Sequence, residues 1–446
     1  MIKRTILNYL EQWQRNKYRK PLILRGARQV GKTTSVNEFG KKYDNYLYFN
    51  LENKQDRILM EQEIPLESKI DLMYLSKEQS KKGGRTLIFI DEIQNSPSTI
   101  ALLRYFYEQH NDIHVIAAGS LLENLVDIKV SFPVGRVEYA AMRPCSFREF
   151  ANASEFSGIY EYIIEKPDYS QTFHSTLINL FNQYSIVGGM PEAVERYLDN
   201  HDIIAADRIY ETLITAYRDD VEKYTLTNKL INVVRFILNA GWGCAGEIIK
   251  LGNFAGSNYN SSDIRAAFQL LEKAMLLELV YPTTSTRLPA FGEIKRMPKL
   301  IWLDTGLVNF AAQVRTAIIH SKDIMDVWRG RIAEHIVAQE LLTLSHSVNQ
   351  KRMFWMKGGG GGSAEVDFLW NHESCLFPIE VKAGHNSRLR SLHSFIEASP
   401  FDMAIRVWGE PFSVEEHVTT IKRKRFKLIN LPYYLVGCLP QIVDRL

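Results

Sequence analysis

A glycine-rich run near the N-terminus carries residues suited to binding phosphate. The run has the spacing G-x-x-x-x-G-K-T and lies between the apolar segment 22–24 and a helical pattern, which is the context that this motif requires. Glycines allow backbone N–H groups to face a phosphate, the lysine reaches the β- and γ-phosphates of ATP, and the threonine hydroxyl can bind Mg²⁺. A chance glycine turn before a helix is the plainer alternative. The predicted nucleotide-binding residues are Gly26, Ala27, Arg28, Gln29, Val30, Gly31, Lys32, Thr33 and Thr34.

A second apolar segment, 87–90, ends in two acids. Asp91 would hold Mg²⁺, directly or through water, and Glu92 would orient and deprotonate the water that attacks ATP. The alternative is a strand that merely reaches the surface at a polar turn. Ser120, at the end of a further apolar segment, suits either a sensor of the γ-phosphate or a helix N-cap. The run and the acids together predict an ATP and Mg²⁺ site, with Thr33 and Asp91 as the residues nearest the metal.

An arginine that stabilises the charge developing on ATP is harder to place. Arg136 and Arg143 both lie beyond the predicted sheet, where a subunit boundary could fall, and an ordinary surface ion pair is the alternative for each. We expect Arg136 to act on the ATP of a neighbouring subunit, which predicts a homo-oligomer.

A third group of polar residues lies in the C-terminal part of the chain. Asp367 stands in an alternating strand pattern, and Glu380 and Lys382 share one face of a later strand. Two carboxylates can bind one or two Mg²⁺ while the lysine positions or activates water beside a phosphodiester, and an inward Glu334 from a helix upstream would complete the site. A surface pair of Glu and Lys is the alternative. The predicted catalytic residues are Glu334, Asp367, Glu380 and Lys382, with Asp367 and Glu380 as metal ligands.

The elements that must position these residues follow from the hydrophobic pattern. Apolar runs at 22–24, 46–51, 86–90 and 114–118 alternate with helical patterns at 70–81 and 97–110, which predicts a mostly parallel sheet covered by helices on both faces. The fold class is therefore α/β and multidomain. We expect a P-loop ATPase core at 1–145, a helical lid at 146–201, a winged-helix-like domain at 202–285 and a nuclease-like α/β domain at 286–446. Within the third of these, residues 261–263 predict the N-cap of a helix over 264–274.

Composition bounds the remaining possibilities. The 446 residues exceed one ordinary core, and the net charge of +3 neither requires nor excludes a nucleic-acid partner. Four scattered cysteines and the lack of an apolar stretch of about 20 residues predict a cytoplasmic protein that does not enter a membrane. Gly358 to Ser363 has the composition of a flexible linker, either an engineered replacement or a native hairpin tip.

The ordered set of motifs resembles a prokaryotic family of AAA-type P-loop ATPases whose C-terminal region, of unassigned function, contains a PD-(D/E)XK nuclease-like core. The segments that carry the resemblance are 26–34, 89–94, 118–121, 135–137, 144–150, 188–192, 303–307, 330–334, 365–368 and 379–384. The resemblance implies an AAA-like ATPase, a winged-helix middle and a restriction-endonuclease-like end. It places Lys32, Thr33, Asp91 and Glu92 at ATP, and the four C-terminal residues named above at a nuclease-like site.

Two functions remain open at this point. The leading hypothesis is an ATP-hydrolysing protein that acts on DNA or RNA through a Mg²⁺-dependent nuclease-like domain. The alternative is a signalling or scaffold ATPase whose nuclease fold only binds DNA or protein.

Overall fold

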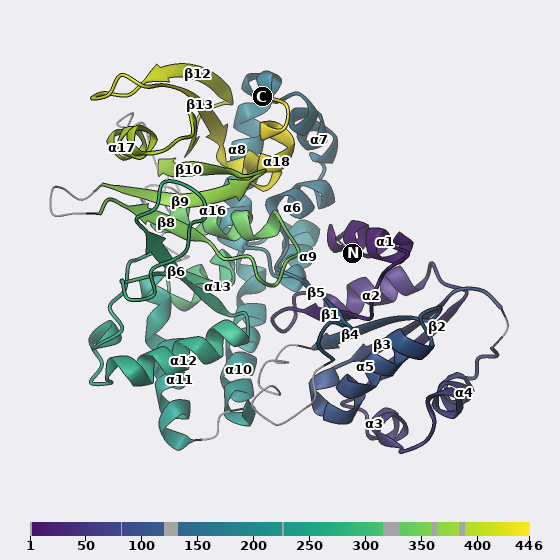
Figure 1. Cartoon of the computed structure of the whole chain (residues 1–446). Coiled ribbons are helices and arrows are strands. Elements are labelled where there is room, and N and C mark those ends of the chain that lie inside the picture. The colour runs from purple at the N-terminus through teal and green to yellow at the C-terminus, as the bar shows by residue number, and fades with distance from the viewer. Residues whose placement is uncertain are drawn as a thin grey trace.

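The computed structural model describes residues 2–81, 83–119, 133–224, 227–314, 331–358, 364–382 and 389–446. Figure 1 shows an N-terminal lobe built around β1–β5 and a larger lobe around the C-terminal strands, with the helices α10–α13 beneath the latter. None of the helices in the described ranges is long and apolar enough to cross a membrane.

The N-terminal sheet has five parallel strands in the order β2-β3-β4-β1-β5. Alternate residues of one strand face opposite sides, so Leu22 and Leu24 pack in one apolar cluster and Ile23 in another. Helices cover both faces, which confirms the predicted α/β arrangement. The strands are β1 (Leu22–Arg25), β2 (Asn45–Asn50), β3 (Thr86–Asp91), β4 (His114–Gly119) and β5 (Glu138–Ala141), and the helices are α1 (Ile6–Arg15), α2 (Lys32–Gly40), α3 (Lys54–Glu61), α4 (Leu66–Ser76) and α5 (Pro97–Gln109).

Four helices follow the sheet and pack against the C-terminal half of the chain. They are α6 (Phe147–Ala153), α7 (Ser157–Glu165), α8 (Ser170–Val187) and α9 (Pro191–Asn200). Phe147, Phe181 and Tyr184 contact one another edge-on or tilted, and the ring of Tyr433 stacks on Phe181 at 5.7 Å. The helices predicted as a lid thus share an apolar core with the distant C-terminal segment.

The C-terminal sheet has eight strands in the order β12-β13-β11-β10-β9-β8-β6-β7, with parallel and antiparallel neighbours. β6 comes from the predicted middle domain, yet its Tyr281 pairs with Met353 of β8. The boundary predicted at residue 285 therefore follows directly after a strand of this sheet. The strands are β6 (Leu277–Thr283), β7 (Lys299–Trp302), β8 (Met353–Met356), β9 (Glu365–His372), β10 (Cys375–Lys382), β11 (Met403–Trp408), β12 (Ser413–Val418) and β13 (Arg425–Pro432).

The helices of this half are α10 (Asp207–Tyr224), α11 (Asn228–Ala240), α12 (Ser261–Lys273), α13 (Thr305–Ala311), α16 (Arg331–Thr343), α17 (Arg390–Ala398) and α18 (Leu439–Val443). The N-cap of α12 is Asn260, whose side chain accepts a hydrogen bond from the Asp263 backbone N–H. The cap predicted at 261–263 was thus one residue late, because Ser and Asn are both good caps and only the backbone geometry distinguishes them. Likewise the helix predicted at 70–81 runs from Leu66 to Ser76.

A buried carboxyl joins the two halves of the larger lobe. Glu340 of α16 accepts hydrogen bonds through Oε1 from the Phe147 backbone N–H (3.0 Å) and from the Tyr184 hydroxyl (2.7 Å). Burial raises the pKa of Glu340 to about 7.

Candidate active site

The glycine-rich run forms the turn between β1 and α2. Gly31 adopts φ 93°, a left-handed conformation that glycine reaches without strain. A Cβ on Gly26 would lie 2.5 Å from the Met142 carbonyl oxygen, so only glycine fits there. The Lys32 ammonium turns back into this loop and donates to the carbonyls of Gly26 (2.9 Å) and Ala27 (2.8 Å). A buried cation thus lies inside the backbone turn, where the sequence predicts the phosphates.

The acid at the end of β3 meets the threonine at the start of α2. The Thr33 hydroxyl donates to Asp91 Oδ2 over 2.6 Å, although the two residues are 58 positions apart in the chain. A hydroxyl and a carboxylate side by side fit Mg²⁺, which prefers oxygen ligands, and bound Mg²⁺ would neutralise phosphate charge at this point. Glu92 has a left-handed backbone (φ 52°) and accepts a hydrogen bond from the Gln94 side-chain amide.

Burial shifts the charges of this site. It lowers the pKa of Lys32 to about 8, against the opposing effect of Glu92 and Asp91, and it raises the pKa of Asp91, against the hydrogen bond from Thr33. Both shifts mean that isolated charge is costly here, as expected for a site that binds a charged ligand.

Residues outside the run hold the phosphate loop from two sides. The Arg4 guanidinium donates to the Val30 carbonyl at 2.7 Å, and Arg28 forms an ion pair with Asp220 of α10. The Tyr217 hydroxyl on the same helix donates to the Arg28 carbonyl at 3.3 Å. No role was predicted for Arg4 from the sequence, since an isolated arginine near a terminus has no local signature.

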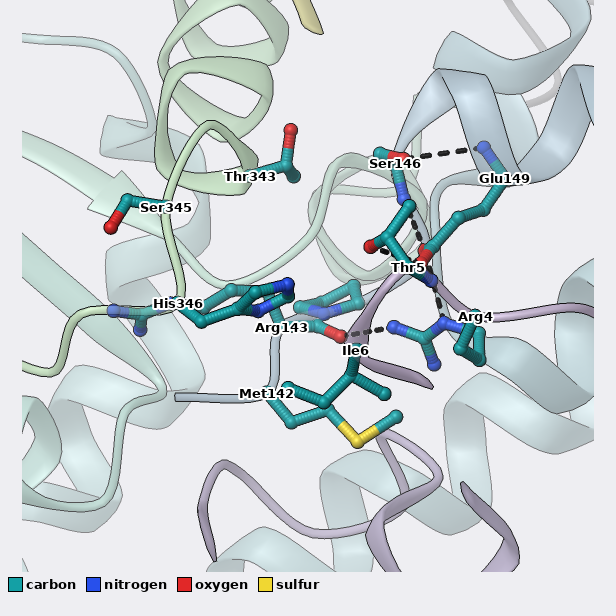
Figure 2. Close-up of a pocket in the computed structure, with 11 residues that line it drawn as sticks. Arg4, Thr5, Ile6, Met142, Arg143, Ser146, Glu149, Thr343, Ser345 and His346 are labelled. Carbon is teal, nitrogen blue, oxygen red and sulfur yellow. Dashed lines mark hydrogen bonds and ion pairs between the residues drawn. The ribbon is translucent and has the colours of Figure 1, made fainter. Parts of the chain in front are cut away.

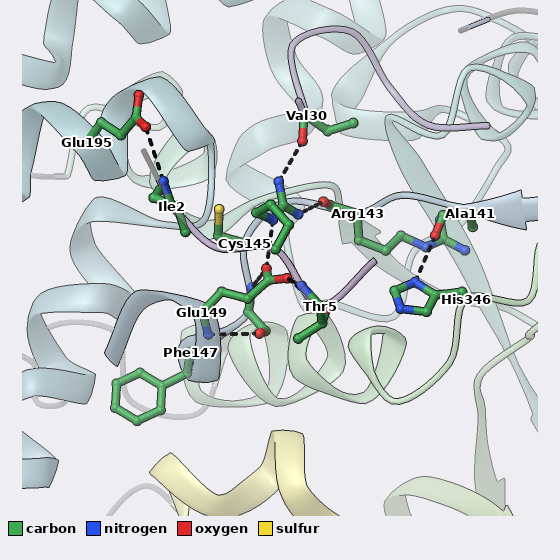
Figure 3. A network of polar contacts seen from close by, with 12 residues as sticks. Ile2, Thr5, Val30, Ala141, Arg143, Cys145, Phe147, Glu149, Glu195 and His346 are labelled. Carbon is green, nitrogen blue, oxygen red and sulfur yellow. Dashed lines mark hydrogen bonds and ion pairs between the residues drawn. The ribbon is translucent and has the colours of Figure 1, made fainter. Parts of the chain in front are cut away.

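Arg4 belongs to a polar network that also reaches the C-terminal half. Its guanidinium donates to Glu149 Oε2 (3.0 Å) and to the Arg143 carbonyl (2.6 Å), while the Thr5 hydroxyl donates to Glu149 Oε1 (2.7 Å). Figure 2 shows these side chains around a small pocket whose other wall includes His346. In Figure 3 the His346 ring lies against the Ala141 carbonyl, at 3.3 Å, and so connects the segment after α16 to the end of β5.

The segments 188–192 and 303–307, which have no predicted role, pack against each other. Asp304 caps α13 by accepting from the Leu307 backbone N–H at 3.0 Å and also accepts from the Gly189 backbone N–H. A Cβ on Gly306 would overlap the Val187 carbonyl and lie 2.6 Å from the Tyr210 hydroxyl. The glycines at 188, 189 and 306 therefore permit a close backbone approach. Pro191, two residues after Gly189, lies beside Gly31 of the phosphate loop, with its Cγ 3.7 Å from a Cβ built there.

The C-terminal acids come together from three elements. Glu334 lies in α16, Asp367 in β9, and Glu380 and Lys382 in β10. The Lys382 ammonium donates to Glu380 Oε1 (2.7 Å), which agrees with one shared strand face. The Val381 backbone N–H donates to Asp367 Oδ2 (2.7 Å) and fixes that carboxylate against β10.

Two further members of this cluster, Glu365 and Lys299, were not predicted from the sequence. This lysine stands at the start of β7, is 3% exposed, and pairs with Glu334 (2.8 Å), Glu365 (2.8 Å) and Asp367 (3.5 Å). A single lysine before an apolar strand carries no signal of burial, so only the sheet order could reveal it.

The carboxyl groups of this cluster repel one another. Burial, followed by the charge of Asp367, raises the pKa of Glu334 and of Glu380 to about 7 in each case. Burial would lower the pKa of Lys299, but the charges of Asp367, Glu334 and Glu365 outweigh it and raise that pKa.

The chemistry of these donors fits a hard divalent cation. The oxygen ligands that the cluster offers are all carboxylates, and Glu380 Oε2 is buried with no hydrogen-bond partner among the described residues. The spacing does not fit an ion shared by three of these carboxylates. Within the described ranges, the only residues that bring three potential ligand atoms within 4.8 Å of one another are the half-buried His372 and the exposed Glu373 and Asp444.

The remaining predicted residues lie away from these contacts or outside the described residues. Arg136 pairs with Glu108 on α5 at 2.9 Å and is 43% exposed. Arg143 is partly buried, and the loss of solvent around its guanidinium lowers its pKa to about 10. Ser120 lies outside the described residues, and so do residues 359–363 of the linker-like segment that begins at Gly358. The Lys357 N–H donates to the Ala364 carbonyl at 2.9 Å, so this loop connects the antiparallel strands β8 and β9.

Comparison with known proteins agrees with the N-terminal site. Residues 18–151 match a family described as "AAA domain", residues 178–317 match a domain of unknown function (DUF8612), and residues 329–434 match another (DUF4143). The parallel sheet, the phosphate loop and the acids after β3 therefore define an AAA-type P-loop ATPase domain. No curated protein matches the chain.

Solved structures resemble the chain only distantly. A Walker-type ATPase of Pyrococcus abyssi is 14% identical, with a TM-score of 0.39, over 70% of this chain and 96% of that one. The Orc1 protein of Aeropyrum pernix, in complex with DNA, is 10% identical (TM-score 0.27; 69% and 90%), and Cdc6p of Pyrobaculum aerophilum is 12% identical (0.24; 70% and 92%). With TM-scores below 0.5, these likenesses add nothing to the assignment.

Proposed function

We propose that this protein hydrolyses ATP at the phosphate loop and that its nucleotide state controls a C-terminal site that acts on the phosphodiesters of DNA or RNA. The observation that carries the proposal is the convergence of Glu334, Asp367, Glu380 and Lys382 from three separate elements into one largely buried cluster. Mere surface ion pairing of a strand would leave these groups in water. A bound Mg²⁺ would supply a Lewis acid there, held by Asp367 and Glu380.

The roles at the ATP site follow from the geometry above. Lys32 and the loop backbone would bind the phosphates, Thr33 and Asp91 would hold Mg²⁺, and Glu92 would act as the general base. Arg136 is exposed, which suits action on a neighbouring subunit in a homo-oligomer, and its ion pair with Glu108 would then exchange for phosphate. The helices α10–α12 with β6 and β7 would serve as a winged-helix unit that contacts DNA.

Contacts through Arg4 and α16 would let the nucleotide state at the ATP site affect the acid cluster. Arg4 contacts the phosphate loop and Glu149, and α16 carries Glu334 near one end and leads to His346 at the other. A change in the phosphate loop would therefore act on the segment that follows α16 through contacts with the end of β5.

A second candidate function is a nucleotide-controlled switch or scaffold whose C-terminal domain binds DNA or protein without cleavage. The ion pairs of Lys299 with Glu334, Glu365 and Asp367 favour it, because an ammonium there competes with a metal ion.

The test is ATP hydrolysis with Mg²⁺, with and without single- and double-stranded DNA or RNA, scored for strand cleavage in the same samples. Wild type is compared with Glu92→Gln and Asp367→Ala. We expect Glu92→Gln to lose ATP turnover by about 10²-fold or more while still binding ATP, and Asp367→Ala to lose cleavage but not turnover. Cleavage that survives in pure Asp367→Ala protein contradicts the assigned site, and turnover without any cleavage supports the switch.

A further inference from the structure

Lys299 is held as a fixed cation in the C-terminal acid cluster. Its ammonium lies 2.8 Å from carboxylate oxygens of both Glu334 and Glu365, and it also lies over the rings of Phe354 (5.0 Å) and Phe368 (5.6 Å). Aromatic faces attract cations, so the rings and the carboxylates together favour the charged form against the cost of burial. An ammonium held by this many partners does not leave the cluster readily.

The charge balance of the cluster leaves room for one divalent cation. Among the described residues it contains four carboxylates, of Glu334, Glu365, Asp367 and Glu380, against two ammonium groups, of Lys299 and Lys382, when all six groups are ionised. The remainder is two negative charges, which one Mg²⁺ or Mn²⁺ neutralises. A two-metal site would instead bring an excess of positive charge into a largely buried region, which is costly.

The contacts show which carboxylates Lys299 binds closely and which are left to bind a metal ion. Glu334 and Glu365 are bound closely by Lys299, whereas Asp367 lies farther from it, at 3.5 Å, and is oriented by the Val381 N–H. Glu380 keeps one buried oxygen without a partner among the described residues.

We propose that Lys299 takes the place of a second metal ion, so that the C-terminal site binds one divalent cation, between Asp367 and Glu380. Lys299 contacts both Glu334 and Glu365 and keeps them from acting as ligands. This inference rests on the proposed function, since it concerns the metal of the same site. It adds the stoichiometry of that metal and the residue that sets it.

The experiment counts Mn²⁺ bound to the nucleotide-free full chain by the EPR signal of free Mn²⁺. An Asp91→Asn background removes the acid of the ATP site, so that only the C-terminal site is counted. We expect one Mn²⁺ per chain in this background, none after Glu380→Gln, and two after Lys299→Met, because Glu334 and Glu365 then become available. Lys351→Met is the matched control: it also removes one ammonium, but one that is 68% exposed and pairs with Glu272 outside the cluster, and it should keep one Mn²⁺.

The possible failures are distinguishable. A count of zero in the Asp91→Asn background contradicts the metal site of the proposed function itself. A count of two there overturns the role of Lys299 without any substitution at that residue. A count of one that persists in folded Lys299→Met protein overturns this inference alone. If Lys299→Met does not fold, Lys299→Arg retains the charge and should keep one Mn²⁺, and a count of two in that variant overturns the inference.

Discussion

Replacing Arg4 by methionine should weaken both the fold and ATP binding. The substitution removes hydrogen bonds to Glu149 Oε2, to the Val30 carbonyl and to the Arg143 carbonyl, all in a region where Arg4 and Glu149 are 8% and 3% exposed. Breaking a buried ion pair by removing one partner costs about 3–5 kcal/mol. Glu149 keeps its bonds from Thr5 and from the Ser146 backbone N–H, so we expect the lower end of this range, ~3 kcal/mol.

Part of this loss should appear in the affinity for ATP. The Val30 carbonyl belongs to the phosphate loop, and without Arg4 the loop must be ordered by ATP itself. A hydrogen bond to a charged group contributes roughly 1.5–3 kcal/mol. If ~1–2 kcal/mol of this free energy is lost from ATP binding, the affinity for ATP falls about 5- to 30-fold. A fluorescent ATP analogue measures the Kd, and the midpoint of thermal unfolding should fall in the same variant.

The control is Arg15→Met, at the other end of the same N-terminal segment. Arg15 is 79% exposed and makes a surface ion pair with Glu11 at 3.7 Å, which should contribute at most about 1 kcal/mol. Arg4→Met protein with the Kd and unfolding midpoint of Arg15→Met would refute the reasoning that Arg4 supports the loop.

Three further changes test other parts of the structure. Burial raises the pKa of Glu340 to about 7, so the folded protein binds this proton more tightly than the unfolded chain does. The contribution of Glu340 to stability is therefore complete below about pH 4.5 and is lost as the pH rises through 7. Glu340→Gln should remove this loss and be more stable than wild type at pH 8 by up to ~3 kcal/mol in chemical unfolding, whereas equal stability at pH 8 would contradict the assigned pKa. Gly306→Ala should fold poorly because its methyl overlaps neighbouring backbone, while Gly158→Ala, which meets nothing within 4 Å, should behave as wild type by circular dichroism. Arg136→Ala should lower ATP turnover in the proposed oligomer. The control Arg104→Ala, which loses a contact to the same Glu108 oxygen, should leave turnover unchanged. Equal turnover in the two variants would exclude action of Arg136 on a neighbouring subunit.

Local spacing was enough to predict the phosphate loop and its partners. The glycines, Lys32 and Thr33 are neighbours in the chain, and the strand that ends at Asp91 is a continuous apolar run, so short-range rules apply. The same holds for Glu380 and Lys382, because the two-residue period of a strand places them on one face. The short β5 escaped prediction because Glu138 to Ala141 includes no run of large apolar side chains like the one in β1, which is equally short.

Contacts between distant segments were decided only by the tertiary structure. Arg4 meets Glu149 across 145 positions and Lys299 meets Glu334 across 35, and no local pattern specifies either pair. In the C-terminal sheet β6 and β8 lie between β7 and β9, yet Lys299 of β7 contacts Glu365 and Asp367 of β9. The sequence by itself therefore predicted the phosphate loop and the acids that we propose as ligands of ATP and of metal ions. The packing of strands and helices determined which charges neighbour one another, and those neighbours set how the acids can be used.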